Sequence, residues 1–273
     1  MLKVSALFIY PIKACRGIEV QAFRLDALGP QLDRRFMLVD EQGGFISQRQ
    51  EPRLSQVVPT LGPTALLVKA PGMQTLKLPL SLRDDGRVTE IKVWKHTGPA
   101  IEADASVHEW FSEWLHRPCR LVHMPYAQLR RVDPDYAAEP AFTAFTDGFP
   151  ELLVSQSSVD DLGKRAQMPL SVERFRPNIV VSGSEPYAED SWKHIRIGDV
   201  PFDVVKPCSR CAVTTIDPAT SEQGKEPLAT LASYRKQNGK TLFGQNCIHR
   251  ELGTIRVSDP VEVLTCQREE SES

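Results

Sequence analysis

Short apolar or alternating runs follow one another along residues 4–100 of the chain. Among them are ALFIYPI, IEVQAFRL, RFMLVD, ALLVKA and TEIKVW, and the segments between them, such as DALGP, DEQGG and RDDGR, carry glycine, proline and aspartate. Alternation with period two, bounded by residues that favour tight turns, is typical of antiparallel strands. We therefore expect this region to form an antiparallel β structure, as a sandwich or a barrel.

Helical spacing replaces this alternation in residues 104–117, DASVHEWFSEWLHR. The apolar side chains of that segment recur on one helical face: Val107, Trp110, Phe111, Trp114 and Leu115. Asp104 or Ser106 is suited to cap the helix. We expect these tryptophans to pack into a core rather than to bind a cofactor.

The second half of the chain again contains more strand patterns than helix patterns. Strands are expected within residues 151–155, 177–183, 194–205, 211–217 and 253–264. Helices are expected at 157–167, with Ser157 or Ser158 as the cap, and at 227–237. Residues 132–145 have no clear period and are rich in proline, alanine and aspartate, and we expect a long loop of this kind to cover a substrate.

These patterns predict a mainly β protein with some helices, of the α+β class. We expect an N-terminal β-barrel-like domain at residues 1–120 and a second β-barrel domain with flanking helices at residues 121–266. Residues 267–273 have nothing to bury and are expected to be a disordered tail. A chain of 273 residues is long for a single hydrophobic core, which agrees with two domains.

The charge of the chain is close to balanced. A formal net charge of -2 provides no overall attraction to nucleic acid or acidic membranes, so any anion site must be a local cluster of cations. No run approaches the roughly 18 apolar residues of a spanning helix, and Tyr10 and Pro11 interrupt the first apolar run too early for a signal peptide. Six scattered cysteines suit a reducing compartment, so we expect a cytoplasmic protein with no membrane and no nucleic-acid partner.

Cys208 and Cys211 lie three positions apart in KPCSRCAVTTIDPAT, and several uses of such a pair are open. A zinc site needs four ligands, and the only compact second pair is Cys247 with His249, whose spacing is poor for tetrahedral coordination. A dithiol redox site needs a helix after the first cysteine, whereas the β-branched residues that follow favour a strand. A single thiolate can also bind a metal that a cofactor supplies, with Arg210 favouring the deprotonated thiol. Two ordinary half-buried cysteines on a strand are the remaining possibility.

Six segments, spread in order over nearly the whole chain, carry further polar side chains. They are YPIKACRG at 10–17, DRRFMLVD at 33–40, TDGFPELLVS at 146–155, RFRPNIVVSG at 174–183, KPCSRCAVTTIDPAT at 206–220 and LFGQN at 242–246. Each is weak alone, but together they resemble the molybdenum-cofactor sulfurase C-terminal (MOSC) domain family with its N-terminal β-barrel domain. Within it the chain is most similar to the mitochondrial amidoxime-reducing component and its bacterial relatives that reduce N-hydroxylaminopurine.

The resemblance implies a molybdenum-molybdopterin cofactor whose metal takes one protein cysteine as ligand. That ligand falls on Cys211, which makes Cys208 a neighbour and lets Arg210 polarise the site. The implied cofactor contacts are Lys13, Arg35, Thr146, Asp147, Gly148, Arg176, Asn178, Ser209, Arg210 and Asn246. Cations suit the cofactor's phosphate, while amide and carboxylate groups suit the edge of a pterin. Pro177 is expected to hold its two neighbours on an extended segment.

Two positions depart from the family pattern. Ala14 stands where relatives often carry a serine, so a hydroxyl contact to the cofactor is lost or supplied by backbone. Phe149 stands where relatives can carry a smaller polar residue, which leaves no polar side-chain contact there.

The resemblance also implies a molybdenum-dependent oxidoreductase that reduces N-hydroxylated compounds, namely hydroxylamines, amidoximes and N-hydroxylated bases, to amines. The chain has neither a dinucleotide fingerprint nor the four-cysteine spacing of an iron-sulfur cluster. Electrons are therefore expected from a separate donor, such as a ferredoxin-like or flavin reductase protein. The alternatives are a sulfur-transfer or cofactor-carrier protein, and a non-catalytic binding module with a zinc clip.

Overall fold

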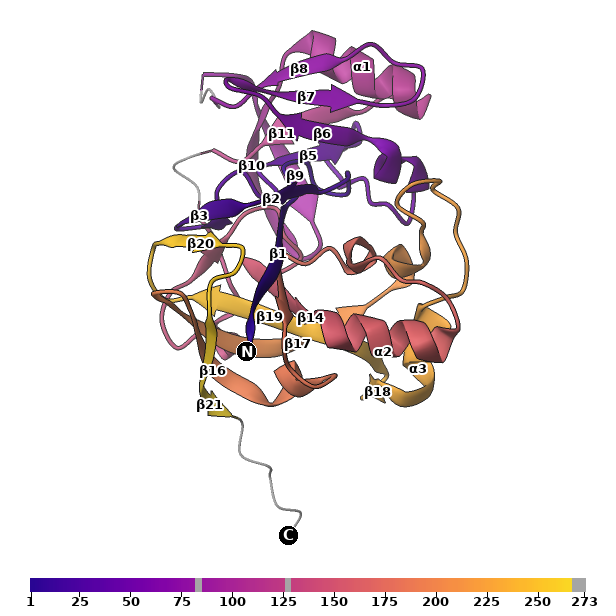
Figure 1. Cartoon of the computed structure of the whole chain (residues 1–273). Coiled ribbons are helices and arrows are strands. Elements are labelled where there is room, and N and C mark those ends of the chain that lie inside the picture. The colour runs from indigo at the N-terminus through magenta and orange to yellow at the C-terminus, as the bar shows by residue number, and fades with distance from the viewer. Residues whose placement is uncertain (82–84, 126–128, 267–273) are drawn as a thin grey trace.

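The computed structural model describes residues 1–81, 85–125 and 129–266. The predicted tail at 267–273 lies outside the described residues. The chain forms two halves, one above the other in Figure 1, and strands dominate both. The expectation of a mainly β fold of the α+β class is therefore confirmed.

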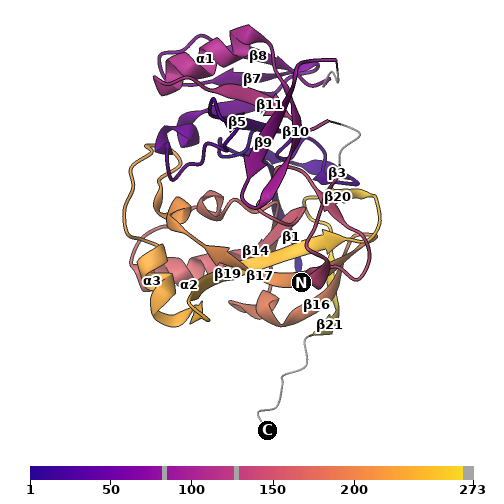
Figure 2. The same ribbon diagram turned by 180° about the vertical axis from the view of Figure 1, so that it is seen from behind.

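A large sheet forms the lower half. Its strands run in the order β2 (Ile18–Val20), β1 (Lys3–Ile9), β15 (Ile179–Ser182), β14 (Glu151–Ser155), β19 (Lys240–His249), β17 (Val200–Arg210), β16 (Trp192–Ile197) and β21 (Val261–Cys266), and β18 (Lys236–Gln237) pairs with β19. All of these pairs are antiparallel except β14 with β15. Helices α2 (Gln156–Ala166) and α3 (Leu228–Tyr234) lie beside each other at one end of this sheet (Figure 2).

The upper half contains two smaller antiparallel sheets and one helix. One sheet has the order β5 (Phe36–Val39), β11 (Arg120–His123), β10 (His96–Glu102) and β9 (Val88–Val93), and the other has the order β6 (Val58–Leu61), β7 (Ala65–Lys69) and β8 (Leu76–Pro79). Helix α1 (Ala105–Leu115) packs on β8 and β11. The upper half has a hydrophobic core of its own, centred on side chains such as Leu38, Leu66 and Phe111.

Strands from the two ends of the chain connect the two halves. Strand β1 belongs to the lower sheet although it comes first, and β20 (Thr254–Arg256) pairs with β3 (Ala22–Asp26), which in turn pairs with β4 (Gly29–Pro30). Strand β11, at the predicted boundary of residue 120, belongs to the upper sheet. The division into 1–120 and 121–266 thus remains a prediction, and strands cross it in both directions.

The helix expected at 104–117 is confirmed as α1. Asp104 precedes it, and the apolar face packs inward through Val107, Trp110, Phe111 and Leu115, with Trp114 partly buried. Helix α2 begins at Gln156, earlier than expected, so neither predicted serine caps it. Ser158 instead lies inside the helix, where its hydroxyl donates to Glu189 and accepts from the backbone of Tyr187.

Short segments complete the described chain. Strands β12 (Arg130–Arg131) and β13 (Phe142–Thr143) pair with each other. Five 3-10 turns cover Pro52–Gln56, Pro134–Tyr136, Val172–Phe175, Ala188–Ser191 and Ala212–Thr215. The strand expected at 211–217 is therefore wrong, because β17 ends at Arg210 and the β-branched residues that follow turn back on themselves.

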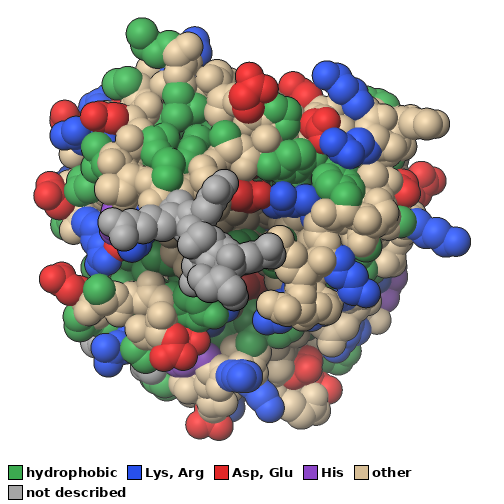
Figure 3. All heavy atoms as spheres, turned by 90° about the horizontal axis from the view of Figure 1, so that it is seen from below, with side chains coloured by type: hydrophobic (Ala, Val, Ile, Leu, Met, Phe, Trp, Pro, Cys, Tyr) green, Lys and Arg blue, Asp and Glu red, His purple; other side chains and the backbone are tan. Residues whose placement is uncertain are grey.

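The surface carries charges of both signs. On the lower face, acidic and basic side chains are interspersed around the edge (Figure 3), which agrees with the small net charge of -2. Among the described helices, none combines the length and the apolar character that crossing a membrane would require.

Candidate active site

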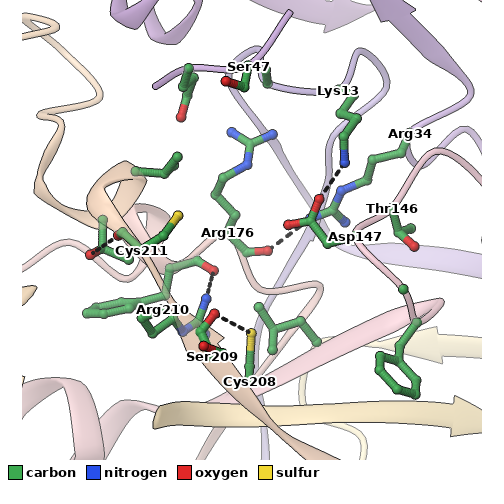
Figure 4. A pocket seen from close by; sticks show the side chains of 18 of the residues that line it. Lys13, Arg34, Ser47, Thr146, Asp147, Arg176, Cys208, Ser209, Arg210 and Cys211 are labelled. Carbon is green, nitrogen blue, oxygen red and sulfur yellow. Dashed lines mark hydrogen bonds and ion pairs between the residues drawn. The ribbon is translucent and has the colours of Figure 1, made fainter. Parts of the chain in front are cut away.

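A recess of about 950 Å³, partly open to solvent, lies where the two halves meet. The predicted residues that line it are Lys13, Thr146, Asp147, Gly148, Arg176, Asn178, Ser209, Arg210, Cys211 and Asn246. The structure thus brings together residues from segments far apart in the sequence (Figure 4).

Cys211 occupies the point where strand β17 gives way to a 3-10 turn. Its backbone is extended, with φ -133° and ψ -177°, and its carbonyl accepts from both the amide (3.1 Å) and the hydroxyl (3.0 Å) of Thr214. These contacts hold the residue at the end of the strand while its thiol stays exposed to the recess.

Cys208 has different surroundings although it lies only three positions away. It is half-buried and packs against the apolar cluster around Phe175 and Phe243. Burial raises the pKa of its thiol, a change that the nearby charge of Arg210 only partly opposes. Both cysteines line the recess, but they are not equivalent, because Cys211 is exposed whereas Cys208 is half-buried.

Arg210 is turned towards the protein backbone. Its Nε donates to the carbonyl of Phe243 at 2.7 Å, and its Nη1 donates to the carbonyl of Phe175 at 2.9 Å. Gly244, with φ +72°, makes room for this arrangement, since a Cβ there would lie 2.7 Å from Val154 and 3.2 Å from Nη2 of Arg210. Arg210 thus ties the β17 wall of the recess to the turn that precedes Arg176, and its Nη2 has no hydrogen-bond partner among the described residues, so the expected polarising role stays a prediction.

Arg176 presents a charge that lacks an ion-pair partner among the described residues. Its Nη1 donates to the carbonyl of Cys15 at 2.7 Å, and its guanidinium lies 4.3 Å from the ring centre of Tyr10. Burial lowers the pKa of Arg176, but arginine remains charged at neutral pH. A half-buried cation without an ion-pair partner is stabilised by an anion, so the recess is suited to an anionic ligand.

The backbone of Arg176 differs from the expectation. The residue has left-handed angles, φ 54° and ψ 45°, instead of an extended conformation. It ends the 3-10 turn Val172–Phe175, and its amide donates to the carbonyl of Glu173. Pro177 does exclude the right-handed helical region, but the turn before it decides which of the remaining regions is used.

Arg35 does not line the recess, whereas its neighbour Arg34 does. The guanidinium of Arg35 is buried in an ion pair with Asp26 at 2.7 Å. Arg34 instead pairs with Asp33 at 2.6 Å and donates to the side-chain oxygen of Asn178 at 2.9 Å. Within this motif, Arg34 rather than Arg35 is therefore the candidate for a cofactor contact.

Lys13 and Asp147 form an ion pair of 2.6 Å at the other side of Arg176 from Cys211 (Figure 4). The Lys13 side chain is 7% exposed, whereas that of Asp147 is 80% exposed to the recess. The protein walls around the recess partly desolvate this exposed carboxylate and raise the pKa of Asp147, but the charge of Lys13 and hydrogen bonds from Lys13 and Trp94 outweigh this effect and hold the pKa well below its usual value. Both donors reach Oδ1, so Oδ2 is left for a ligand.

The remaining predicted residues use their side chains in different ways. The amide of Asn178 is bound to protein groups, because its oxygen accepts from Arg34 and its nitrogen donates to the carbonyl of Phe8. The Thr146 hydroxyl pairs with that of Thr143 at 2.7 Å. These two residues support the wall of the recess.

Three other predicted residues have a polar group or free space that faces the recess: Asn246, Gly148 and Ser209. Asn246 donates to the carbonyl of Lys206 at 3.1 Å, which leaves its oxygen for a ligand among the described contacts. A Cβ built on Gly148 would meet nothing within 4 Å, and Ser209 is exposed. Each of the three can therefore contribute to binding without rearrangement of its neighbours.

Comparison with known proteins agrees with this geometry. Residues 1–118 match the family described as MOSC N-terminal beta barrel domain, and residues 142–262 match the MOSC domain. The mitochondrial amidoxime-reducing component 1 of Homo sapiens is 36% identical over 278 residues, which cover 96% of this chain and 82% of that protein. The chain belongs to the MOSC domain family.

Two further relatives mark the breadth of that family. The mitochondrial amidoxime reducing component 2 of Rattus norvegicus is 35% identical over 94% of this chain and 82% of its own length. The molybdenum cofactor sulfurase of Oryza sativa subsp. japonica is 33% identical over 89% of this chain, which corresponds to 32% of that longer protein.

The MOSC site fits an anionic cofactor with an amide-rich ring. Arg176 supplies a half-buried cation without an ion-pair partner among the described residues, and Asp147 and Asn246 present free acceptor oxygens at the recess. The exposed sulfur of Cys211 is a soft ligand for a metal. Those four features come from the chain itself and match the chemistry of a phosphate, a pterin edge and a molybdenum ion.

Sequence patterns did not reveal several residues of the MOSC site. Trp94, Arg49 and Arg174 also line the recess. Arg174 is paired with Asp217 at 2.6 Å, so its charge is already compensated. The signal for Trp94 was present in the sequence, since an aromatic residue directly after the alternating run TEIKV lies where a turn residue is expected.

The two departures from the family pattern both line the recess. Ala14 has a left-handed backbone with φ 69° and presents only its methyl group. Phe149 packs edge-on against Tyr136, with ring centres 5.7 Å apart. Neither adds a polar side-chain group to the site.

The loop at 132–145 does not line the recess, contrary to the expectation that it covers a substrate. Its Val132 and Ala137 pack on Ile248 of β19, and strands β12 and β13 close it as a hairpin. Apolar contacts with the sheet therefore hold this segment away from the recess.

The zinc alternative finds little support in the described residues. His249 pairs with Glu151 at 2.7 Å, and Cys247 is fully buried in the core of the lower half. The described part of the chain holds no group of three or more histidine, cysteine, aspartate or glutamate residues arranged for a metal. All six cysteines are free thiols.

Proposed function

We propose that this protein is a molybdenum-molybdopterin-dependent oxidoreductase that reduces N-hydroxylated compounds to amines with electrons from a separate donor protein. The observation that carries the proposal is the accessible Cys211 thiol in one recess with the uncompensated guanidinium of Arg176. Relatives that are named amidoxime-reducing components support the choice of substrate class.

The bound cofactor would supply the two-electron chemistry that breaks the N–O bond. The chain would hold the metal through Cys211 and the phosphate through Arg176, with Arg34 behind it. Asp147 and Asn246 would accept hydrogen bonds from the pterin edge. Arg210 would keep the β17 wall in place through its two carbonyl contacts.

Metal analysis with matched cysteine variants tests this proposal. We expect natively purified wild-type protein to contain molybdenum and a releasable pterin, and Cys211→Ser to lose most of the molybdenum. Cys208→Ser is the matched control and should keep its metal, because Cys208 is half-buried against apolar side chains. Undiminished molybdenum in Cys211→Ser would overturn the ligand assignment.

The need for a separate electron donor has its own test. Protein given a chemically reduced dye should reduce an N-hydroxylated base, while protein given NADH alone should not. Activity with NADH alone would contradict a separate donor. A cytoplasmic location remains a prediction, since the relatives named above are called mitochondrial.

A sulfur-transfer or carrier role is the second candidate, because the Oryza sativa relative is named a molybdenum cofactor sulfurase. In that case the exposed thiol of Cys211 would carry a sulfur atom as a persulfide. Mass spectrometry of natively purified protein distinguishes the two functions. A persulfide on Cys211 in protein without molybdenum would favour sulfur transfer.

A further inference from the structure

Trp94 stands at an unusual place in the fold. It is the first of the two residues that connect β9 to β10, and its backbone has the left-handed angle φ 56°. Two-residue hairpin turns of this kind favour asparagine, aspartate or glycine, because a bulky side chain is strained there. A glycine would close the turn without this strain, so the indole is expected to have a use outside the turn.

Contacts from several segments hold the indole ring at the mouth of the recess. Its Nε1 donates to Oδ1 of Asp147 at 3.0 Å, and its ring lies edge-on to Phe45 with centres 5.7 Å apart. The guanidinium of Arg49 lies 5.0 Å from the ring centre. Trp94 and Phe45 both line the recess.

Part of the indole remains uncovered despite these contacts. Trp94 is 43% exposed, which is high for a large aromatic side chain that is anchored by a hydrogen bond. An aromatic surface that is held rigidly and left open is suited to stack against another flat ring. The hydrogen bond to Asp147 fixes the orientation of this surface before any ligand arrives.

We propose that Trp94 and Phe45 form an aromatic wall that selects N-hydroxylated compounds with a planar ring over aliphatic ones. This inference rests on the proposed function, since it names the substrate class of the same recess. The ring of the substrate would stack on Trp94 at the mouth, and the N–O group would point inwards to the part of the recess that holds Cys211 and Arg176.

The reaction assumed here is balanced. The N–O bond of an amidoxime breaks, and the nitrogen is reduced by two electrons from an external electron carrier. Two protons are taken up with these electrons, one by the nitrogen and one by the leaving hydroxide, so an amidine and water are formed. Trp94 takes no part in the electron or proton transfer, and its effect is on which substrate is held.

A matched pair of substrates tests the wall. Benzamidoxime and acetamidoxime carry the same reducible group, but only the first has a planar ring. With holoprotein and a reduced dye, we expect Trp94→Ala to lower kcat/KM for benzamidoxime about tenfold, as loss of one stacking contact does, mainly through KM. The value for acetamidoxime should change less than about twofold on the same reasoning.

Trp94→Phe keeps a ring while it removes the N–H donor to Asp147. We expect this variant to retain most of the preference for benzamidoxime. Molybdenum content measured in parallel separates an effect on substrate from an effect on the cofactor. An equal loss for both amidoximes in Trp94→Ala, at unchanged molybdenum, would overturn the aromatic wall.

Fluorescence gives a second measure that does not need turnover. Benzamidine, the product of benzamidoxime, should quench part of the tryptophan emission of the wild-type protein, and this quenching should be absent in Trp94→Phe. Equal quenching in both proteins would also contradict the wall. If the wild-type protein reduces neither amidoxime, the proposed function fails, while this titration still decides whether a planar ring binds at Trp94.

Discussion

The two sides of the recess differ in how completely their charges are balanced. On one side, Lys13 and Asp147 form an ion pair that Trp94 supports with a further hydrogen bond. On the other side, Arg176 has no ion-pair partner among the described residues and Cys211 has an exposed thiol. The ion pair on the first side contributes to the stability of the folded protein. The unpaired charge on the second side lowers that stability, and a bound anion would offset the loss.

Arg210→Met should give the largest change, because Arg210 supports the unpaired side from behind. The substitution leaves the carbonyls of Phe243 and Phe175 without their charged donor. We expect the free energy of unfolding to fall by about 3 kcal/mol, as for two hydrogen bonds from a charged group. Urea unfolding measures this loss. Arg210→Lys keeps the positive charge but cannot donate to both carbonyls in the same way. A Lys variant as stable as the wild type would show that the two hydrogen bonds to Phe243 and Phe175 contribute little to stability.

Asp147→Asn removes the ion pair between Lys13 and Asp147. The change leaves the ammonium of Lys13, which is 7% exposed, without its partner at 2.6 Å. We expect a loss of about 2 kcal/mol, below the value for fully buried pairs because Asp147 itself is open to the recess. Lys13→Met combined with Asp147→Asn should recover part of this loss. A double variant as unstable as the sum of the two single variants would show that the pair is not coupled.

The pH dependence of stability provides a second test of the Lys13–Asp147 ion pair. The pKa of Asp147 in the folded protein lies below the ordinary value of 3.8, so its ionised form stabilises the folded state. This contribution is fully present above the ordinary value and is lost as the pH falls through the lower folded-state value. The stability difference between wild type and Asp147→Asn should therefore shrink between about pH 5 and pH 2. A difference that stays constant over this range would contradict the ion pair.

Cys208→Ser should have a small effect on stability. The thiol is half-buried against apolar side chains, so a hydroxyl in its place costs about 1 kcal/mol. Thermal unfolding measures this change. Cys211→Ser should change stability even less, because its thiol is exposed. A larger loss in Cys211→Ser than in Cys208→Ser, without cofactor, would reverse our assignment of the two environments.

Arg176→Met should change the stability of the ligand-free protein only a little. It removes a half-buried charge that forms no ion pair with a described acidic residue, so the stability should stay within about 1 kcal/mol or rise. Inorganic phosphate should raise the unfolding temperature of the wild type more than that of this variant. Arg174→Met is the matched control, since Arg174 is already paired with Asp217. Equal protection by phosphate in wild type and Arg176→Met would exclude an anion site at Arg176.

Much of the fold could be predicted because its patterns are local. The strand alternation before residue 100 and the apolar face of α1 depend only on the spacing of side chains along one element. The turn at Ala212–Thr215 could not be predicted in this way, because its β-branched residues favour a strand. Contacts of Thr214 with the carbonyl of Cys211 decide that the chain turns there.

In the candidate site, too, some features could be predicted from local motifs and others could not. Motifs placed Lys13, Asp147 and Cys211 in one recess, but they could not distinguish Arg34 from Arg35. Neighbouring residues differ little in a linear pattern, whereas the left-handed backbone of Arg34, with φ 47°, turns the two guanidinium groups to different partners.

The sequence alone determined the composition of the two halves, the face that α1 buries and the order of the motifs that mark the family. These features depend on residue types and their spacing. Only the tertiary structure decided which cysteine is accessible, which arginine is unpaired and where Trp94 lies. Exposure and charge compensation depend on residues that are distant in sequence and become neighbours only when the two halves pack together.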